Sequence, residues 1–450
     1  MERALMKDAD EFDLALKDPK SLESLYQTAR RENKAAEFEV EITRRYTSSP
    51  DNPLLAAWYY RLQSEARPEP QARQIPWGLA IPFSLVLSFI YWLFAPSMNA
   101  PIKGVPDILL VWAPAAACLL IAFLAVASQK VMPGLSLPNR FSLSSYQRPL
   151  VIIMAIVVLS IYAFVMGPSS RETYRTLMVL HLPLLATLAV GLFLVGLSDD
   201  QNSFAALHKG AEIVLTAGIV AGAAMAFVGI TIGLFSAIGI DFPEPIKRWL
   251  FIGVPGLIPV IAVAITYDPA LPPLQQRFDQ GFSKLIFTVA RLFLPLTIIV
   301  GVLYLASIPA NFSKPFEQRE VLIVYNAMLF AVMALLSFAT PLYESDVEER
   351  WQTPLRRAII VIASMAVVVS VYALSATVYR TMLGGITANR MVVIGWNTLN
   401  IAILCVFLFR QFRPGRANWI GATQRVFRLG IIGYAAWGLF VTLATPLLFP

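Results

Sequence analysis

Histidine and cysteine are scarce in this chain, which has two of each among its 450 residues. Two histidines, His181 and His208, cannot build a His-rich zinc site, and neither a nucleophile-elbow motif nor a phosphate-binding glycine loop with lysine is present. Both cysteines, Cys118 and Cys405, lie inside apolar segments, which favours two small apolar residues over a disulfide. The sequence therefore indicates no catalytic residue, no metal site and no cofactor, and an enzyme is the least supported class.

Charged residues are also few, at 14% of the chain against about 25% in soluble proteins. Hydrophobic residues make up 57% and the mean hydropathy is +0.63, which predicts a membrane protein with lipids as its surroundings. The net charge of +7 does not indicate a nucleic-acid partner. In a membrane protein, excess Lys and Arg belong to cytoplasmic loops that face anionic lipid.

Eleven segments are long and apolar enough to cross a bilayer, which takes about 20 residues in a helix that satisfies its own backbone. They cover residues 77–95, 107–128, 149–166, 177–197, 210–238, 249–266, 283–307, 320–343, 357–378, 390–410 and 429–449. The predicted fold is an all-α, polytopic transmembrane helix bundle of about 11 spans.

Residues 1–75 are predicted to form a small cytoplasmic helical region and linker, and residues 76–450 the transmembrane domain. Asp18-Pro19 and Asp51-Asn52-Pro53 are typical helix starts. Between and after them, apolar residues recur at helical spacing. Such short helices bury apolar surface only against each other or against a partner. Residues 1–70 are therefore a candidate surface for a cytoplasmic protein partner.

The orientation follows from the positive charges in alternate connections. One side of the membrane has 17 Lys and Arg and the other side 9, and five of the 17 lie between residues 410 and 428. Because cytoplasmic loops hold the excess, the N-terminal region is predicted in the cytoplasm and Pro450 on the opposite side.

Small residues form a stripe along the fifth predicted span. Gly218, Gly222, Ala226, Gly229 and Gly233 follow one another at steps of four, four, three and four, so they share one helix face. This spacing predicts close packing against another helix, in preference to a substrate path.

The sixth and seventh spans contain the strongest candidates for a binding site. Gly253, Pro255, Gly256 and Pro259 fall within seven residues and should kink or interrupt their helix. Broken helices often form substrate sites in transporters, although proline is also common in ordinary membrane helices. Arg291, two turns into the next span, can snorkel to the headgroups or enter the bundle, and we expect the latter because Pro295 frees its carbonyl.

Other ionisable groups at membrane depth have plainer explanations. His181 lies one turn into its span and is predicted to be a hydrogen-bonded core residue. Glu212 begins the glycine-bearing span with Lys209 three residues before it, a local pair suited to the membrane interface.

The C-terminal half contains a series of motifs with a recognisable order. They are Arg291-Leu-Phe-Leu-Pro295, Phe338-Ala-Thr-Pro341-Leu-Tyr343, Trp351 with Arg356-Arg357, Arg380, and Leu383-Gly-Gly-Ile-Thr387-Ala-Asn389-Arg390 running into Gly395-Trp396-Asn397. Over about residues 150–450 the chain resembles a family of uncharacterised bacterial polytopic membrane proteins, a domain of unknown function. That family favours Tyr-Gly where this chain has Gly384-Gly385. The resemblance implies bacterial origin, the inner membrane and a polytopic topology, but no reaction.

The turn between the ninth and tenth spans can also be interpreted physically. Gly384-Gly385 permits a sharp reversal, and Thr387 can cap the tenth span. Arg380 and Arg390 bracket this loop on the side where positive charge is normally depleted, so each needs a lipid phosphate, an acidic side chain or an anionic ligand as partner. Asn397 is placed for an interhelical hydrogen bond.

These features predict a transporter-like protein for a small solute or lipid, with a cavity near the sixth, seventh and tenth spans. The candidate substrate-binding residues are Arg291, Gly253, Pro255, Gly256, Pro259, Arg380, Arg390 and Asn397. The alternative is a membrane scaffold or regulatory subunit that binds a partner through its N-terminal helices. A large polar cavity at mid-membrane favours the first function, and a solid bundle with an apolar groove on residues 1–70 favours the second.

Overall fold

The computed structural model describes residues 18–31, 35–49, 52–65, 75–97, 104–131, 147–168, 171–196, 199–412 and 418–449. These residues form helices and loops, with no strand among them, so the all-α fold is confirmed. The chain divides into two compact units, residues 1–74 and 75–450.

The first unit contains α2 (Pro19–Arg31), α3 (Ala35–Ser48) and α4 (Pro53–Glu65). Asp18 caps α2 by accepting hydrogen bonds from the backbone of Lys20 at 3.2 Å and Ser21 at 3.1 Å. The apolar faces meet in a core where the Tyr26 ring lies 5.3 Å from the rings of both Phe38 and Trp58. This unit therefore has an aromatic core of its own.

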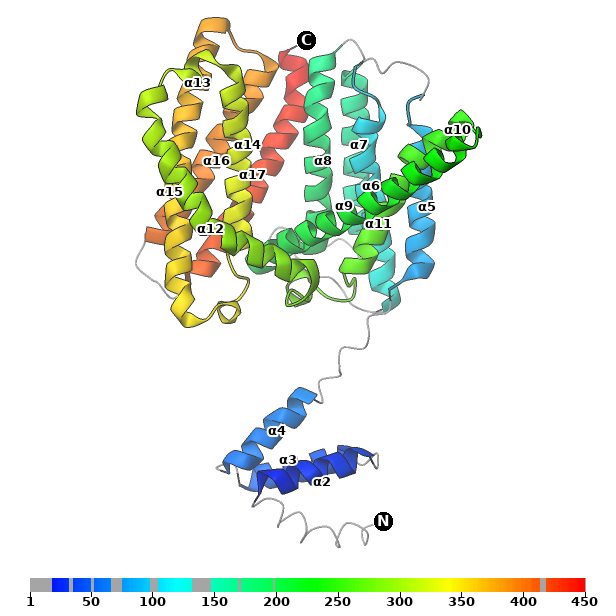
Figure 1. Cartoon of the computed structure of the whole chain (residues 1–450), viewed down its shortest axis with the longest axis vertical. Helices are drawn as coiled ribbons and strands as arrows, with labels where there is room; N and C mark the ends of the chain where they lie inside the picture. The colour runs from blue at the N-terminus through cyan, green and yellow to red at the C-terminus, as the bar shows by residue number, and fades with distance from the viewer. Residues whose placement is uncertain are drawn as a thin grey trace. The chain divides into compact units, whose positions relative to one another are not determined.

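The second unit is a bundle of long helices (Figure 1). They are α5 (Trp77–Leu93), α6 (Ile108–Val131), α7 (Gln147–Met166), α8 (Glu172–Val195), α9 (Asp200–Ala237), α10 (Glu244–Arg248), α11 (Val254–Thr266), α12 (Gly281–Ser307), α13 (Lys314–Glu317), α14 (Arg319–Ala339), α15 (Glu349–Gly384), α16 (Ala388–Phe412) and α17 (Trp419–Leu448). In the described residues, ten helical segments are long and apolar enough to span a membrane, where eleven were predicted. The eleventh, α5, is apolar but has 17 residues, about 25 Å, against a hydrocarbon core of about 30 Å. The chain is a multi-pass membrane protein.

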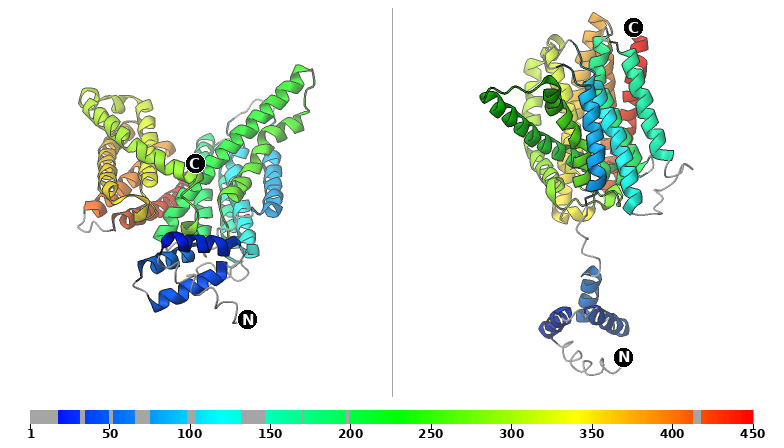
Figure 2. Two further views of the ribbon diagram at one scale, coloured as in Figure 1. Left: turned by 60° about the horizontal axis from the view of Figure 1, so that its bottom comes forward. Right: turned by 90° about the vertical axis from the view of Figure 1, so that its right-hand side faces the viewer.

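The bundle has two halves, each with its own core. Helices α5 to α8 and α11 surround residues such as Leu87 and Ile121, and α12 to α17 surround residues such as Leu336 and Ile359. Helix α17 packs against α8 and α9 and thereby joins the halves. Helices α9 and α12 begin beside each other and then diverge in opposite directions (Figure 2, left).

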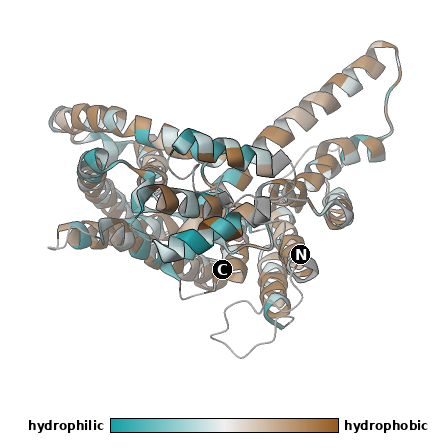
Figure 3. Cartoon of the chain, turned by 90° about the horizontal axis from the view of Figure 1, so that it is seen from below, coloured by the Kyte–Doolittle hydropathy of each residue, from teal (hydrophilic) through white to brown (hydrophobic). Residues whose placement is uncertain are grey.

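Helix α9 crosses from one half to the other. Its first turns place Phe204 in the core of the C-terminal half, and its later turns pack along α11 through Val228. With 38 residues it is about 57 Å long, so it must tilt or protrude from the bilayer. The arm that it forms is apolar or neutral along its length, as Figure 3 shows at the upper right.

The glycine stripe of α9 does not pack against another helix, contrary to the prediction. Gly218, Gly222, Gly229 and Gly233 are exposed, and a Cβ added at any of them would meet no atom within 4 Å. The physical reason is that α9 uses its opposite face, which includes Thr216 and Val228, against the rest of the bundle.

The sixth predicted span is a bent but continuous helical segment. Residues Trp249–Gly253 form a π-helical turn between α10 and α11, so the proline- and glycine-rich sequence changes the local winding without breaking the helix. A Cβ at Gly256 would lie 2.7 Å from the Ser88 Cα of α5, so two backbones meet at this point.

Candidate functional site

A groove of about 930 Å³ lies between α12, α14 and α15, bounded at one end by α9. Its walls include Phe293 and Val300 of α12, Leu335 of α14 and Met365 of α15. No charged side chain lines it, and its polar side chains are Thr297 and Tyr304. The groove is therefore suited to hydrocarbon and not to a hydrated solute.

The groove remains open because α12 lies at the edge of the bundle and small residues line the contact. Ala290 and Gly301 of α12, Ala331 of α14 and Ala366 of α15 are the small residues of the lining. The lining of α12 runs from Leu285 to Tyr304, about 28 Å of helix, which matches the thickness of a hydrocarbon core. Leu296 and Val300 are more than half exposed, so the groove is accessible from the side of the bundle.

A buried ion pair on α9 flanks Ala211, which lines the groove. Lys209 Nζ lies 2.6 Å from Glu212 Oε2 and donates to the Arg277 carbonyl at 2.9 Å. The Ser283 hydroxyl donates to the same carboxylate oxygen at 2.5 Å, so the pair joins the first turns of α9 and α12. Because the Lys209 ammonium and the Ser283 hydroxyl both donate to the Glu212 carboxylate, the buried charges are compensated and connect the two diverging helices.

Tyrosines lie at the other end. The hydroxyls of Tyr304 and Tyr325 are hydrogen-bonded to each other, and the Tyr372 hydroxyl donates to the Phe312 carbonyl at 2.8 Å. Tyrosine at a helix end is typical of the membrane interface, where the ring is in hydrocarbon and the hydroxyl in a polar layer. The groove is thus apolar along most of its length, with the Tyr304 hydroxyl at one end.

Arg291 points toward protein and not into lipid. It is half-buried on α12, its Nε donates to the Ala339 carbonyl at 3.4 Å, and its guanidinium carbon lies 5.8 Å from the centre of the Phe287 ring. Its partner is on α14, however, and not on the sixth span. The Phe287 ring also stacks on the ring of His208, with the two ring centres 5.0 Å apart.

The remaining candidates of the sixth span lie elsewhere. Gly253, Pro255, Gly256 and Pro259 belong to the π-helical turn and to α11, which packs against α5, α6 and α9. The structure therefore does not bring them together with Arg291. Gly253 accommodates the Trp249 ring, since a Cβ there would lie 2.6 Å from Trp249 Cδ1.

Arg380 and Arg390 have backbone partners in place of the expected anions. Arg380 Nη1 donates to the Glu317 carbonyl at 2.8 Å, and Arg390 Nη1 to the Gly385 carbonyl at 2.6 Å. Gly385 has a φ of +72°, which suits the reversal between α15 and α16. Asn397 is buried on α16, and its Nδ2 has no hydrogen-bond partner among the described residues.

Two structural features were not recognised in the sequence. The first is a small-residue face on α5, where Ala80, Ser84 and Ser88 are buried at intervals of four and meet α11 at Gly256. Its spacing is the same signal that the glycine stripe shows. The second is the groove itself, because the sequence does not indicate which apolar helix faces are left without close packing against another helix.

His181 is a hydrogen-bonded core residue, as predicted. Its Nδ1 lies 2.8 Å from the Leu177 carbonyl, and the Trp396 indole donates to its Nε2 at 3.1 Å. Within the described residues no group of histidine, cysteine and acidic side chains could hold a metal ion.

Comparisons of the chain with protein-family models, with curated proteins and with solved structures gave no match.

Proposed function

We propose that this chain is a multi-pass protein of the bacterial inner membrane, with residues 1–75 in the cytoplasm, that binds and transfers a lipid through its lateral groove. The observation that carries the proposal is the apolar groove of about 930 Å³, which runs for roughly the thickness of a bilayer core along α12. The inner-membrane location rests on the family resemblance, and the orientation rests on the 17 to 9 distribution of positive charge.

The chemistry of the lining favours a lipid over a small solute. A polar solute that crosses a membrane needs hydrogen-bonding or charged groups along its path. The groove offers only Thr297 and the terminal Tyr304, so a hydrated molecule would lose its water without compensation. A hydrocarbon tail loses no solvation free energy when it leaves the bilayer for an equally apolar groove. Its selection therefore depends on the shape of the groove and on the polar side chain at its end, Tyr304.

Photo-crosslinking in proteoliposomes tests this function. A phospholipid with a photoreactive group in its acyl chain should label the groove face of α12, at Phe293 and Thr297, more than the outer face at Ile299 and Leu303. Ala331→Phe should fill the groove and reduce that labelling. Ala223→Phe makes the same change outside the groove, on the exposed face of α9, and should leave the labelling of α12 unchanged.

Equal labelling of both faces of α12 would contradict the proposal, because the groove would then be ordinary lipid-facing surface. Unchanged labelling of Phe293 and Thr297 in the Ala331→Phe variant would also contradict the proposal.

The second candidate function is a scaffold or regulatory subunit. It is favoured by the separate aromatic core of residues 1–74, which gives the chain a compact unit outside the membrane helices. Removal of residues 1–74 from the full chain separates the two functions. It should abolish capture of a cytoplasmic partner if the second is correct, and it should leave acyl-chain labelling unchanged if the first is correct.

A further inference from the structure

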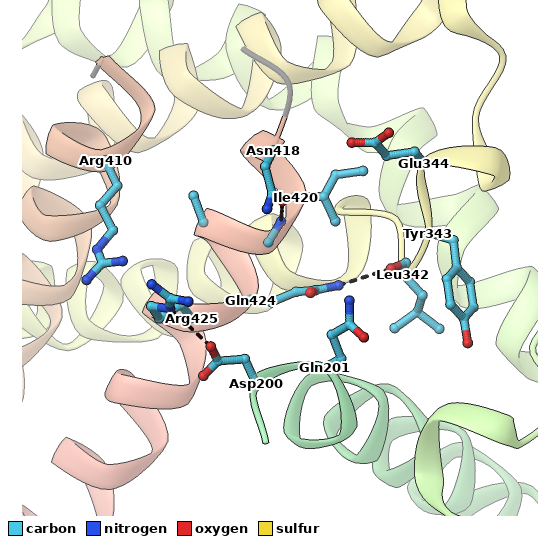
Figure 4. Close-up of a pocket in the computed structure, with 12 residues that line it drawn as sticks. Asp200, Gln201, Leu342, Tyr343, Glu344, Arg410, Asn418, Ile420, Gln424 and Arg425 are labelled. Atoms are coloured by element: carbon cyan, nitrogen blue, oxygen red, sulfur yellow. Dashed lines mark hydrogen bonds and ion pairs between the residues drawn. The ribbon is translucent and has the colours of Figure 1, made fainter. Parts of the chain in front are cut away.

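A second cavity, of about 590 Å³, lies where α9, α16 and α17 meet the loop after α14 (Figure 4). It is formed by the beginnings of α9 and α17, the end of α16 and the residues that follow α14. All four are on the side of the membrane predicted to be cytoplasmic. The cavity shares no lining residue with the apolar groove, so it is independent of the proposed function.

Positive charge is only partly compensated in this pocket. Arg425 Nε lies 3.1 Å from Asp200 Oδ2, and Arg428 Nη1 lies 2.6 Å from Asp200 Oδ1. One carboxylate is therefore shared between two guanidinium groups. Arg425 lines the pocket, and Arg428 follows three residues later on α17. Arg428 Nε is buried and has no hydrogen-bond partner among the described residues.

Arg410 adds a further positive charge. It lines the pocket from the end of α16, is half-buried, and forms no hydrogen bond or ion pair with any residue that the structure describes. In Figure 4, Arg410, Arg425 and Asp200 line one side of the pocket and Glu344 the other. Glu344 is exposed and makes no ion pair with either arginine. An arginine that buries its methylene stem and has no ionic partner keeps its guanidinium available to an anion.

The beginning of α17 increases the positive potential. Asn418 caps this 30-residue helix by accepting from the Gly421 backbone at 3.0 Å, and both residues line the pocket. The positive end of the helix dipole therefore faces the cavity. The wall is fixed by Gln424, which is buried and donates to the Leu342 carbonyl at 3.0 Å.

We propose that this pocket binds a phosphate group, held by Arg410 and Arg425 at the surface of the membrane. Guanidinium groups recognise phosphate through paired hydrogen bonds, and basic pockets between membrane helices on the cytoplasmic side bind anionic lipid headgroups. The phosphate can come from a phospholipid headgroup or from a soluble phosphate compound, and the experiment distinguishes these sources.

The test is lipid and phosphate binding by the purified full-length protein. Native mass spectrometry should show retention of phosphatidylglycerol over phosphatidylcholine. Arg410→Gln should lower that retention about tenfold, the loss expected for one charge-assisted hydrogen bond. Since Arg410 has no hydrogen-bond or ion-pair partner in the described structure, its replacement breaks no polar contact and should not impair folding. Arg350→Gln is the matched control, because Arg350 is exposed, lies on the same predicted side and pairs with Glu348 at 2.6 Å.

Asp200→Asn tests whether positive charge in the pocket strengthens phosphate binding. Removal of the shared carboxylate should raise phosphatidylglycerol retention, even if the variant is less stable to heat. If inorganic phosphate instead stabilises the delipidated wild type against heat but not Arg410→Gln, the site is real and its occupant is soluble. The proposal is overturned if Arg410→Gln binds both phosphatidylglycerol and inorganic phosphate as the wild type and Arg350→Gln do.

Discussion

At the contact between Gly256 of α11 and Ser88 of α5, the backbones of two membrane helices approach each other closely. A Cβ at position 256 would lie 2.7 Å from Ser88 Cα and 3.0 Å from the Leu87 carbonyl oxygen. Carbon atoms pack at about 3.5–4.0 Å, so Gly256→Ala must push the helices apart by about 1 Å. Because backbone cannot rotate away as a side chain does, we expect a loss of about 2 kcal/mol in the free energy of unfolding.

Gly222→Ala is the control, because position 222 on α9 faces open space and the same methyl group meets no atom within 4 Å. Its effect should stay within about 0.5 kcal/mol. The assay is the midpoint of unfolding in increasing dodecyl sulfate, measured for both variants in the same detergent. Equal midpoints for the two variants would refute the helix contact and, with it, the structural role assigned to Gly256.

Two further predictions concern the ion pair and the topology. Lys209→Met leaves the Glu212 carboxylate buried without its cation and should lower the free energy of unfolding by about 3–5 kcal/mol. The double variant Lys209→Met/Glu212→Gln should lower it by less. If the losses of the two single variants simply add in the double variant, the pair is not coupled. In intact cells, an impermeant thiol reagent should label a cysteine placed at Asn389 and not one placed at Lys20, in a background without Cys118 and Cys405, and the reverse pattern would invert the orientation.

The sequence was sufficient to predict the helices and most of their ends. Long apolar runs specify spanning helices because no other structure satisfies its backbone in hydrocarbon. The helices α9, α15 and α17 nevertheless begin about eight to ten residues before the predicted spans, at Asp200, Glu349 and Trp419. Hydropathy marks the most apolar part of a helix, and the more polar turns that precede it in the same helix give no such signal. In α9 and α17 these turns are partly buried in the protein.

The arrangement of the helices could not be predicted from one sequence. The spacing of small residues is the same whether they face another helix or open space. The patterns of α9 and α5 therefore predict helix packing equally well, but only α5 uses its small residues for packing. Arg380 and Arg390 were expected to need anions, but carbonyls at the ends of neighbouring helical segments satisfy them. Such carbonyls belong to every helix end and have no sequence signature.

An electron cryo-microscopy map of the protein in lipid nanodiscs is the most direct test of the lipid-binding groove. We predict elongated acyl-chain density beside α12 between Phe293 and Val300, bounded by Ala331 of α14 and Met365 of α15. A map in which α12 packs directly onto α14 and α15 and leaves no room for a chain would contradict the account.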